Sequence, residues 1–312
     1  MKTYLDFTLQ PQKFLNIWLL FYVLVLLPYG WYTYRVSSGK FEMLHPGGFL
    51  LGAILVMLFA LGIYFYFTRV FMEHIRLGEK KVEFTASFPA YLNKIIPGFL
   101  LSMLSMGIYF AWFIRDILRF FAGSIQLDGE AFEFRGSGLR LFTILFLSLF
   151  LPLIVVSLLT FQLPTELLES TWFAIVNQAV FMIIMVPYTY LLWVWIINFR
   201  YRDQYIYLNT PFSEAALFIL KELGLTIITL GVYFPMLYLK VYKYFAERTI
   251  VAKDESYRTL GYDLEAGEDF VFIWRQALLC IVTLGLYVPW AFSKIGKRIL
   301  SKTFLSEPIP TP

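Results

Sequence analysis

Basic side chains that could bind an anion recur after aromatic residues in three segments. They are Arg115 and Arg119 after Trp112, Lys240 and Lys243 after Tyr233, and Lys294, Lys297 and Arg298 after Trp290. Spacings of three and four residues place side chains on one face of a helix. Aromatic rings favour the headgroup level of a membrane and basic side chains extend beyond it, which favours a membrane-interface anchor. The same pattern is also consistent with sites for anionic lipid headgroups or an anionic solute.

No catalytic arrangement accompanies these residues. Six acidic residues cluster between positions 254 and 269, namely Asp254, Glu255, Asp263, Glu265, Glu268 and Asp269, but acidic loop residues are usually just solvated. The sequence has no Ser/His/Asp spacing, HExxH motif or phosphate-binding loop. His45 and His74 lie far apart, and Cys280 is the single cysteine. The sequence therefore predicts no enzyme activity, no metal site and no cofactor.

Composition places the chain among membrane proteins. Its 312 residues are 59% hydrophobic, 20% aromatic and 15% charged, whereas soluble domains carry roughly 25% charged residues. The net charge of +4 comes with no long basic stretch, which argues against a nucleic-acid partner. The first apolar run lacks a small-residue cleavage site and is interpreted as a retained anchor.

Apolar runs predict an all-α polytopic membrane protein with seven transmembrane helices. A span needs about 20 apolar residues. The predicted spans are Phe14–Tyr34, Phe49–Thr68, Ile95–Ile114, Leu141–Leu163, Thr171–Phe199, Leu223–Leu239 and Gln276–Ser293. The segments between them are too short for a separate soluble domain, so one integrated membrane domain is expected, with the lipid bilayer as its surroundings.

A Gly-aliphatic-Tyr motif recurs along the chain and indicates internal repetition. Its copies begin at Gly62, Gly107, Gly231 and Gly285, with tyrosines at Tyr64, Tyr109, Tyr233 and Tyr287, and a degenerate copy is Val186-Pro187-Tyr188. Two copies continue to a proline four residues after the glycine, Pro235 and Pro289, which predicts a helix kink there. Such a kink either bends the helix or exposes backbone carbonyls to a cavity.

The spacing of the motifs predicts a tandem duplication. Tyr64 and Tyr109 each have a counterpart 124 positions later, and Arg76 and Arg200 have the same offset. The predicted units are residues 1–124 and 125–248, with 249–312 as a polar loop and a seventh helix. A three-helix unit crosses the membrane an odd number of times, so the second unit is expected in inverted topology.

The positive-inside rule does not decide the orientation of this arrangement. With seven alternating spans, the Lys and Arg residues divide evenly between the two sides. A short acidic loop containing Glu166 and Glu169 favours a cytoplasmic C-terminus.

One segment is expected to be β-structure. Residues 124–135 alternate apolar and polar side chains around Asp128-Gly129, a strong hairpin-turn pair. A hairpin alone is marginal in water, so it must pack on the membrane domain or pair with another segment.

Several of these motifs resemble one known family. The segments 107–112, 127–129 and 132–138, with the repeats at Gly231 and Gly285, are similar to the signature of the YjgN family of bacterial inner-membrane proteins. The resemblance implies a multi-pass location in the bacterial plasma membrane and carries over no catalytic or ligand residue. Met236 departs from the pattern, which favours Trp at that position.

Two functions are consistent with these features. The expected inverted repeat and broken helices favour a transporter or channel for a small or anionic solute or a lipid. The scarcity of charged residues inside the spans favours a structural or partner-binding membrane protein, because transporters commonly keep ionisable groups in the bundle.

Overall fold

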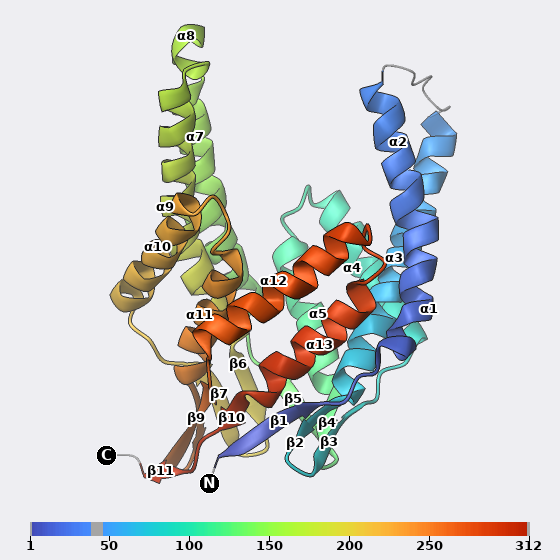
Figure 1. Cartoon of the computed structure of the whole chain (residues 1–312), viewed down its shortest axis with the longest axis vertical. Helices are drawn as coiled ribbons and strands as arrows, with labels where there is room; N and C mark the ends of the chain where they lie inside the picture. The colour runs from blue at the N-terminus through green and yellow to red at the C-terminus, as the bar shows by residue number, and fades with distance from the viewer. Residues whose placement is uncertain (1, 39–45, 311–312) are drawn as a thin grey trace.

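A computed structural model describes residues 2–38 and 46–310 of the chain; within 32–58, several side chains lie outside the description. The chain alternates β-hairpins and helical hairpins. All strands gather at one end of the molecule, and the helices extend from them (Figure 1). His45 and Lys40 lie outside the described residues.

Ten short antiparallel strands form a closed ring. The strands are β1 (Thr3–Phe7), β2 (Ile75–Leu77), β3 (Lys80–Phe84), β4 (Ile125–Leu127), β5 (Glu130–Phe134), β6 (Asn198–Tyr201), β7 (Gln204–Leu208), β8 (Thr249–Lys253), β9 (Ser256–Tyr262) and β10 (Thr303–Leu305). Each pairs with the next, and β10 pairs with both β9 and β1, which closes the ring. A further strand, β11 (Ile309–Pro310), pairs with β9. Closure leaves no open sheet edge apart from this short addition.

The predicted hairpin at 124–135 is confirmed as β4 and β5. Asp128 and Gly129 both have positive φ, 53° and 75°, as a two-residue primed turn requires. The hairpin pairs with β3 on one side and β6 on the other, so it belongs to a larger sheet rather than standing alone.

Helical hairpins of two lengths connect the strands. The long hairpins comprise α1 (Pro11–Phe21), the π-helical η1 (Tyr22–Leu26), α2 (Leu27–Ser37) and α3 (Pro46–Glu73), and then α6 (Gly138–Ile144), the π-helical η2 (Leu145–Phe150), α7 (Leu151–Thr160), α8 (Thr165–Leu168) and α9 (Thr171–Ile196). The short hairpins pair α4 (Phe88–Leu104) with α5 (Phe110–Ser124), α10 (Phe212–Ile228) with α11 (Phe234–Glu247), and α12 (Ala266–Val282) with α13 (Val288–Ser301).

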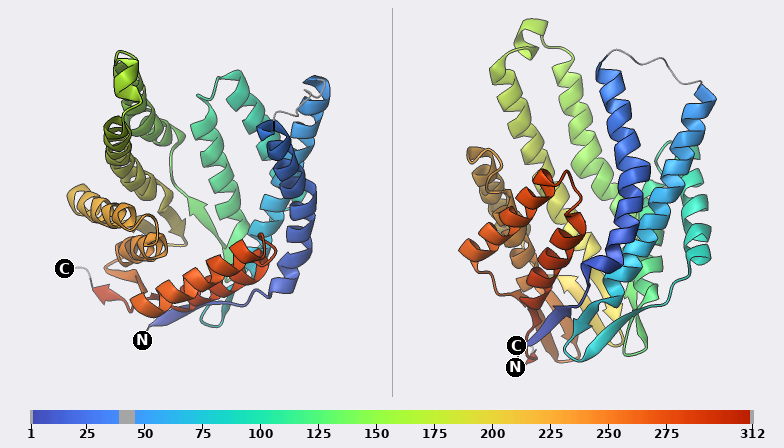
Figure 2. Two further views of the ribbon diagram at one scale, coloured as in Figure 1. Left: turned by 45° about the horizontal axis from the view of Figure 1, so that its top comes forward. Right: turned by 45° about the vertical axis from the view of Figure 1, so that its right-hand side comes forward.

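The helical hairpins also form a ring, which stands on the ring of strands (Figure 2). Each hairpin contacts the next through α3 and α4, α5 and α6, α9 and α10, and α11 and α12, while α13 contacts α1. Buried aromatic and aliphatic clusters lie where the helices meet the strands; one contains Phe65, Phe84, Tyr91 and Phe121, and another contains Phe134 and Trp195. The core is therefore distributed around the ring.

The predicted all-α fold with seven spans is wrong. Three helical stretches among the described residues are long and apolar enough to cross a membrane: Pro11–Trp31, Gly138–Thr160 and Thr171–Ile196. Three other predicted spans, Ile95–Ile114, Leu223–Leu239 and Gln276–Ser293, each contain the turn of a short hairpin. Hydropathy cannot separate a straight helix from two helix ends that flank an apolar turn. The predicted span Phe49–Thr68 lies in α3, where many side chains are outside the described set.

The expected inverted topology is also wrong. Lys80 and Gln204, which inversion would place on opposite sides, lie in β3 and β7 of one closed sheet. The even division of basic residues followed from the wrong span count. Residues 124 positions apart do occupy equivalent places, since Arg76 lies in β2 and Arg200 in β6. The duplication itself and its boundaries at 124 and 248 stay predictions.

Candidate functional site

The glycine motif takes two different structures. At Gly107, Gly231 and Gly285, with φ of 88°, 85° and 91°, the chain reverses between the two helices of a short hairpin. These positions are turns rather than the predicted kinks, and Pro235 and Pro289 lie in the first turn of the following helix, where proline needs no amide partner. Gly62 and Val186, by contrast, lie inside the continuous helices α3 and α9.

A polar triad joins the two helices of the α10–α11 hairpin. Glu222 of α10 is 2% exposed. The Tyr233 hydroxyl donates to its Oε2 at 2.7 Å, and Lys240 Nζ lies 3.3 Å from its Oε1. Lys240 Nζ is also 5.3 Å from the centre of the Tyr233 ring. The buried carboxylate thus has both a hydrogen-bond donor and a counter-ion, as burial of a charge requires.

The α12–α13 hairpin repeats this triad without the acid. Buried Gln276 takes the place of Glu222, and its Oε1 accepts a hydrogen bond from the Tyr287 hydroxyl at 3.1 Å. Lys294 Nζ donates to the same hydroxyl at 2.8 Å. Both tyrosines were predicted as motif residues and both lysines as anion contacts, whereas the buried partners on α10 and α12 were not predicted. The sequence does contain a pattern that could have identified Glu222 and Gln276, because each lies 11 positions before a motif tyrosine.

The third short hairpin lacks such a triad. Gly98 lies 11 positions before Tyr109, and a side chain there would collide with the ring of Phe113. The predicted Tyr109 and Trp112 stack on each other, with ring centres 6.4 Å apart, as Tyr287 and Trp290 also do at 6.0 Å.

The predicted basic residues are mostly engaged with acidic groups of the same chain. Arg115 pairs with Asp116 at 2.6 Å, and Lys243 pairs with Glu247 at 3.6 Å. Among the described residues, Arg119 and Lys297 form no ion pair within 4.0 Å. The structure therefore does not bring the predicted basic side chains together into one anion-binding cluster.

A second polar cluster lies at the base of α12 and α13. Asp269 is 1% exposed and accepts from Arg298 Nε at 2.6 Å and Lys302 Nζ at 2.7 Å. Burial raises the pKa of Asp269, but the hydrogen bonds from Lys302 and Arg298 and from the Glu265 amide outweigh it and hold the pKa below its ordinary value. The sequence had suggested a solvated loop acid here, and that interpretation is wrong for Asp269.

Two apolar cavities lie against one face of α11. The larger, of about 820 Å³, is lined by residues of α11, α12 and α13 together with Phe71 of α3. Because α3 is separated from α11 by three helices along the ring, a cavity that contacts both faces inward. A second cavity, of about 430 Å³, is lined by residues of α9, α10 and α11. Phe234, Tyr238 and Tyr242, on one face of α11, line both.

The lining of these cavities limits what they can hold. Apart from the two tyrosine hydroxyls and the Trp274 indole, the larger cavity is surrounded by aliphatic and aromatic groups, including Ile273, Ile295 and Leu300. The Tyr242 hydroxyl is already bonded to Thr303 Oγ1 at 2.9 Å. A cavity of this size and polarity suits a hydrocarbon-rich ligand rather than an inorganic ion. The described residues include no group of three or more His, Cys, Asp or Glu that could hold a metal ion.

A closed ring of strands carrying a ring of apolar helical hairpins defines a membrane-associated protein with an inward-facing apolar site. Residues 79–210 match a family described as bacterial protein of unknown function (DUF898), the YjgN family. The resemblance predicted from the sequence is thereby confirmed over that region. No curated protein and no solved structure matches the chain.

Proposed function

We propose that this chain is a multi-pass protein of the bacterial inner membrane that takes a hydrocarbon chain of a lipid into its ring and moves that lipid. The observation that carries the proposal is the inward-facing apolar cavity of about 820 Å³. Ligand sites in proteins commonly have this size and are predominantly apolar. The face of α11 that carries Phe234, Tyr238 and Tyr242 connects it to the second cavity.

The distribution of charge supports an orientation with the sheet in the cytoplasm. The sequence has no Lys or Arg between Arg140 and Arg200, an interval that covers almost all of the second long hairpin. Most other basic residues lie in strands, β-turns and helix ends near the sheet. By the positive-inside rule, the strands then face the cytoplasm and the tips of the long hairpins face the opposite side. Since every helical hairpin returns to the sheet, the number of crossings is even.

A lipid is favoured over a small anion as the ligand. An anion site needs unpaired donors or cations, but Lys240 and Arg298 contact buried carboxylates within the chain. Hydrocarbon, by contrast, needs only apolar area, which contributes roughly 25 cal/mol per Å² on burial.

Filling the cavity tests the proposal. Ala277 lines it, and Ala277→Trp should displace bound hydrocarbon. The matched control is Leu217→Trp, at a residue of α10 that is 72% exposed. Lipid retained by the purified protein is measured by mass spectrometry, and lipid movement is followed with a fluorescent phospholipid in reconstituted vesicles. We expect several-fold losses of both for Ala277→Trp and neither for the control.

Two other outcomes of this experiment would argue against lipid movement. Equal lipid content and equal movement in both variants would contradict the proposal. Retained lipid that moves no faster than in protein-free vesicles would favour a structural protein that merely holds lipid.

A further inference from the structure

The three short hairpins share one turn sequence. It is Ser or Thr, an aliphatic residue or Met, Gly, an aliphatic residue and Tyr, at residues 105–109, 229–233 and 283–287. In each copy the second and third residues have positive φ; for the middle copy these are Leu230 at 50° and Gly231 at 85°. The same left-handed pair therefore reverses the chain three times.

Every backbone amide donor of these turns has an acceptor inside its own hairpin. In the middle copy, Thr229, Leu230, Gly231 and Val232 donate to the carbonyls of Leu225, Ile227, Thr226 and Thr229, and Phe234 donates to that of Gly231. The remaining amide, of Tyr233, donates to Thr229 Oγ1 at 3.1 Å. The other two copies repeat the pattern, with Tyr109 donating to Ser105 Oγ at 2.8 Å and Tyr287 to Thr283 Oγ1 at 3.0 Å.

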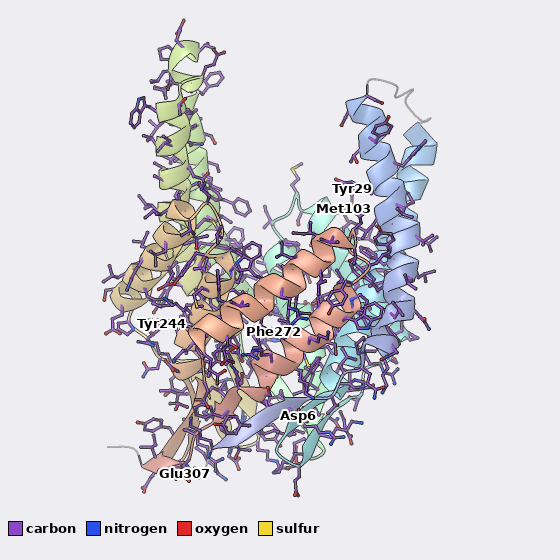
Figure 3. The ribbon with its side chains drawn as sticks, in the orientation of Figure 1. Asp6, Tyr29, Met103, Tyr244, Phe272 and Glu307 are labelled. Atoms are coloured by element: carbon purple, nitrogen blue, oxygen red, sulfur yellow. The ribbon has the colours of Figure 1, made fainter. Side chains whose placement is uncertain are left out.

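The side chains of the same turns project outward and are apolar. Met106 is 95% exposed, Leu230 is 93% exposed and Leu284 is 78% exposed. The neighbouring residues Leu104, Ile228 and Val282 are each about four-fifths exposed, at 82%, 79% and 79%. Met103, which is labelled in Figure 3, lies beside Leu104 at the end of α4 that is far from the sheet. Apolar side chains gathered at a loop tip are unusual in water, where turns are polar.

These two properties together fit one environment. In hydrocarbon no water can bond to an unpaired amide, so only backbone whose donors are satisfied within the protein is tolerated there. We propose that the three short hairpins are re-entrant: each enters the membrane from the sheet side, turns at its glycine inside the hydrocarbon and leaves on the same side. The partner of the exposed tips is the acyl-chain region of the lipid bilayer.

Helix lengths agree with a turn at partial depth. α4, α10 and α12 have 17 residues each, or roughly 25 Å at 1.5 Å per residue, whereas α9 has 26 residues, or roughly 39 Å. The short helices also carry charges that a full span would bury, such as Lys221 and Arg275. In Figure 1 the tips of the short hairpins end well below those of the long hairpins.

Cysteine labelling tests the inference. In a Cys280→Ala background, single cysteines replace Met106, Leu230 or Leu284, and a membrane-impermeant maleimide is applied to sealed vesicles of either orientation. Glu166→Cys reports the far side, Asp254→Cys the sheet side, and Phe150→Cys, 51% exposed in the second long hairpin, reports the hydrocarbon. We expect no labelling of the three tips from either side. Spin labels at the tips should collide with oxygen rather than with a water-soluble nickel complex.

The inference rests on the membrane location proposed above, and the controls separate the two. Labelling of the tips from the sheet side, with Phe150→Cys protected, would overturn the re-entrant arrangement alone. Labelling from the Glu166 side would show that the hairpins span the membrane. Labelling of Phe150→Cys would overturn the membrane location itself.

Discussion

The α10–α11 and α12–α13 hairpins are built alike but hold their buried charge at different depths. Their helices correspond residue for residue at an offset of 54 positions, and both turn at a glycine. In α10–α11 the buried acid is Glu222, near the middle of the helix, and the position near the sheet is the fully buried Ala215. In α12–α13 the middle position is neutral Gln276 and the position near the sheet is Asp269.

This difference separates the interactions that both hairpins share from the buried acid, whose position differs between them. The Tyr–Lys contact and the turn occur with either Glu222 or Gln276, so the fold does not need a carboxylate in the middle of the helix. A buried ion pair generally contributes little net stability compared with a neutral replacement. Glu222 therefore adds an ionisable group to a position where an amide suffices, deep in the hairpin, and such groups in membrane proteins are commonly functional.

The largest expected difference between the hairpins follows from removing the lysines. Lys240→Met leaves the Glu222 carboxylate buried without its counter-ion, which should destabilise the protein by about 3–5 kcal/mol. Lys294→Met removes a charge-assisted hydrogen bond to the Tyr287 hydroxyl but leaves no buried carboxylate without a counter-ion, so it should cost at most about 1.5–3 kcal/mol. Denaturant unfolding in detergent measures both.

The double variant Lys240→Met with Glu222→Gln should recover most of the loss, because the buried partner of Tyr233 is then a neutral amide, as Gln276 is for Tyr287. Equal losses for the two single lysine variants would show that the carboxylate is not charged in the native hairpin.

An intermediate effect is expected at the base of the hairpins. Asp269→Asn should cost about 1–3 kcal/mol at neutral pH, since Arg298 and Lys302 lose a charged acceptor but retain some access to water. The native pKa of Asp269 lies below its ordinary value of 3.8. The carboxylate therefore stabilises the fold above pH 3.8, and this stabilisation is lost as pH falls through the lowered pKa.

The melting temperatures of wild type and Asp269→Asn, measured against pH, should accordingly differ at pH 7 and converge below 3.8. A constant difference across that range would show that Asp269 acts through packing rather than charge.

The smallest expected effect is shared by the two hairpins. Gly231→Ala and Gly285→Ala should each cost about 1–2 kcal/mol, because both glycines have φ near 90° and a Cβ is strained there. Gly224→Ala is the matched control. It lies inside α10 with open space around it, and alanine should stabilise the helix by up to about 1 kcal/mol. Similar effects at all three glycines would show that the turns are looser than their φ values indicate.

The sequence predicts some local features well. Asp128-Gly129 identified a hairpin because a two-residue primed turn depends on those residue types alone. The apolar runs at 14–34, 141–163 and 171–199 likewise largely coincide with helices long enough to cross a membrane. Both signals are local, so they do not depend on how the rest of the chain folds.

The short hairpins were missed because the glycine motif alone does not specify a turn. A hydroxyl residue two positions before the glycine, at Ser105, Thr229 and Thr283, accepts the tyrosine amide in each turn. Where the motif lies within a helix, the same position holds Ala60 or Ile184, whose side chains cannot accept a hydrogen bond from the tyrosine amide. Closure of the sheet was not predictable either, since its strands have three to seven residues and their partners lie in distant segments.

Closure of the sheet also imposes an order on biosynthesis. Thr3 pairs with Leu305, and Lys2 reaches Asp263 at 2.9 Å, so β1 finds its second partner strand only after residue 305 has left the ribosome. Until then β1 has β2 on one side and an open edge on the other, which is an aggregation hazard. Contacts so distant in sequence form slowly. Strand β10 fills the gap between β9 and β1, so the ring closes only after the other nine strands have been synthesised, and a nascent chain stalled before β10 would expose that edge.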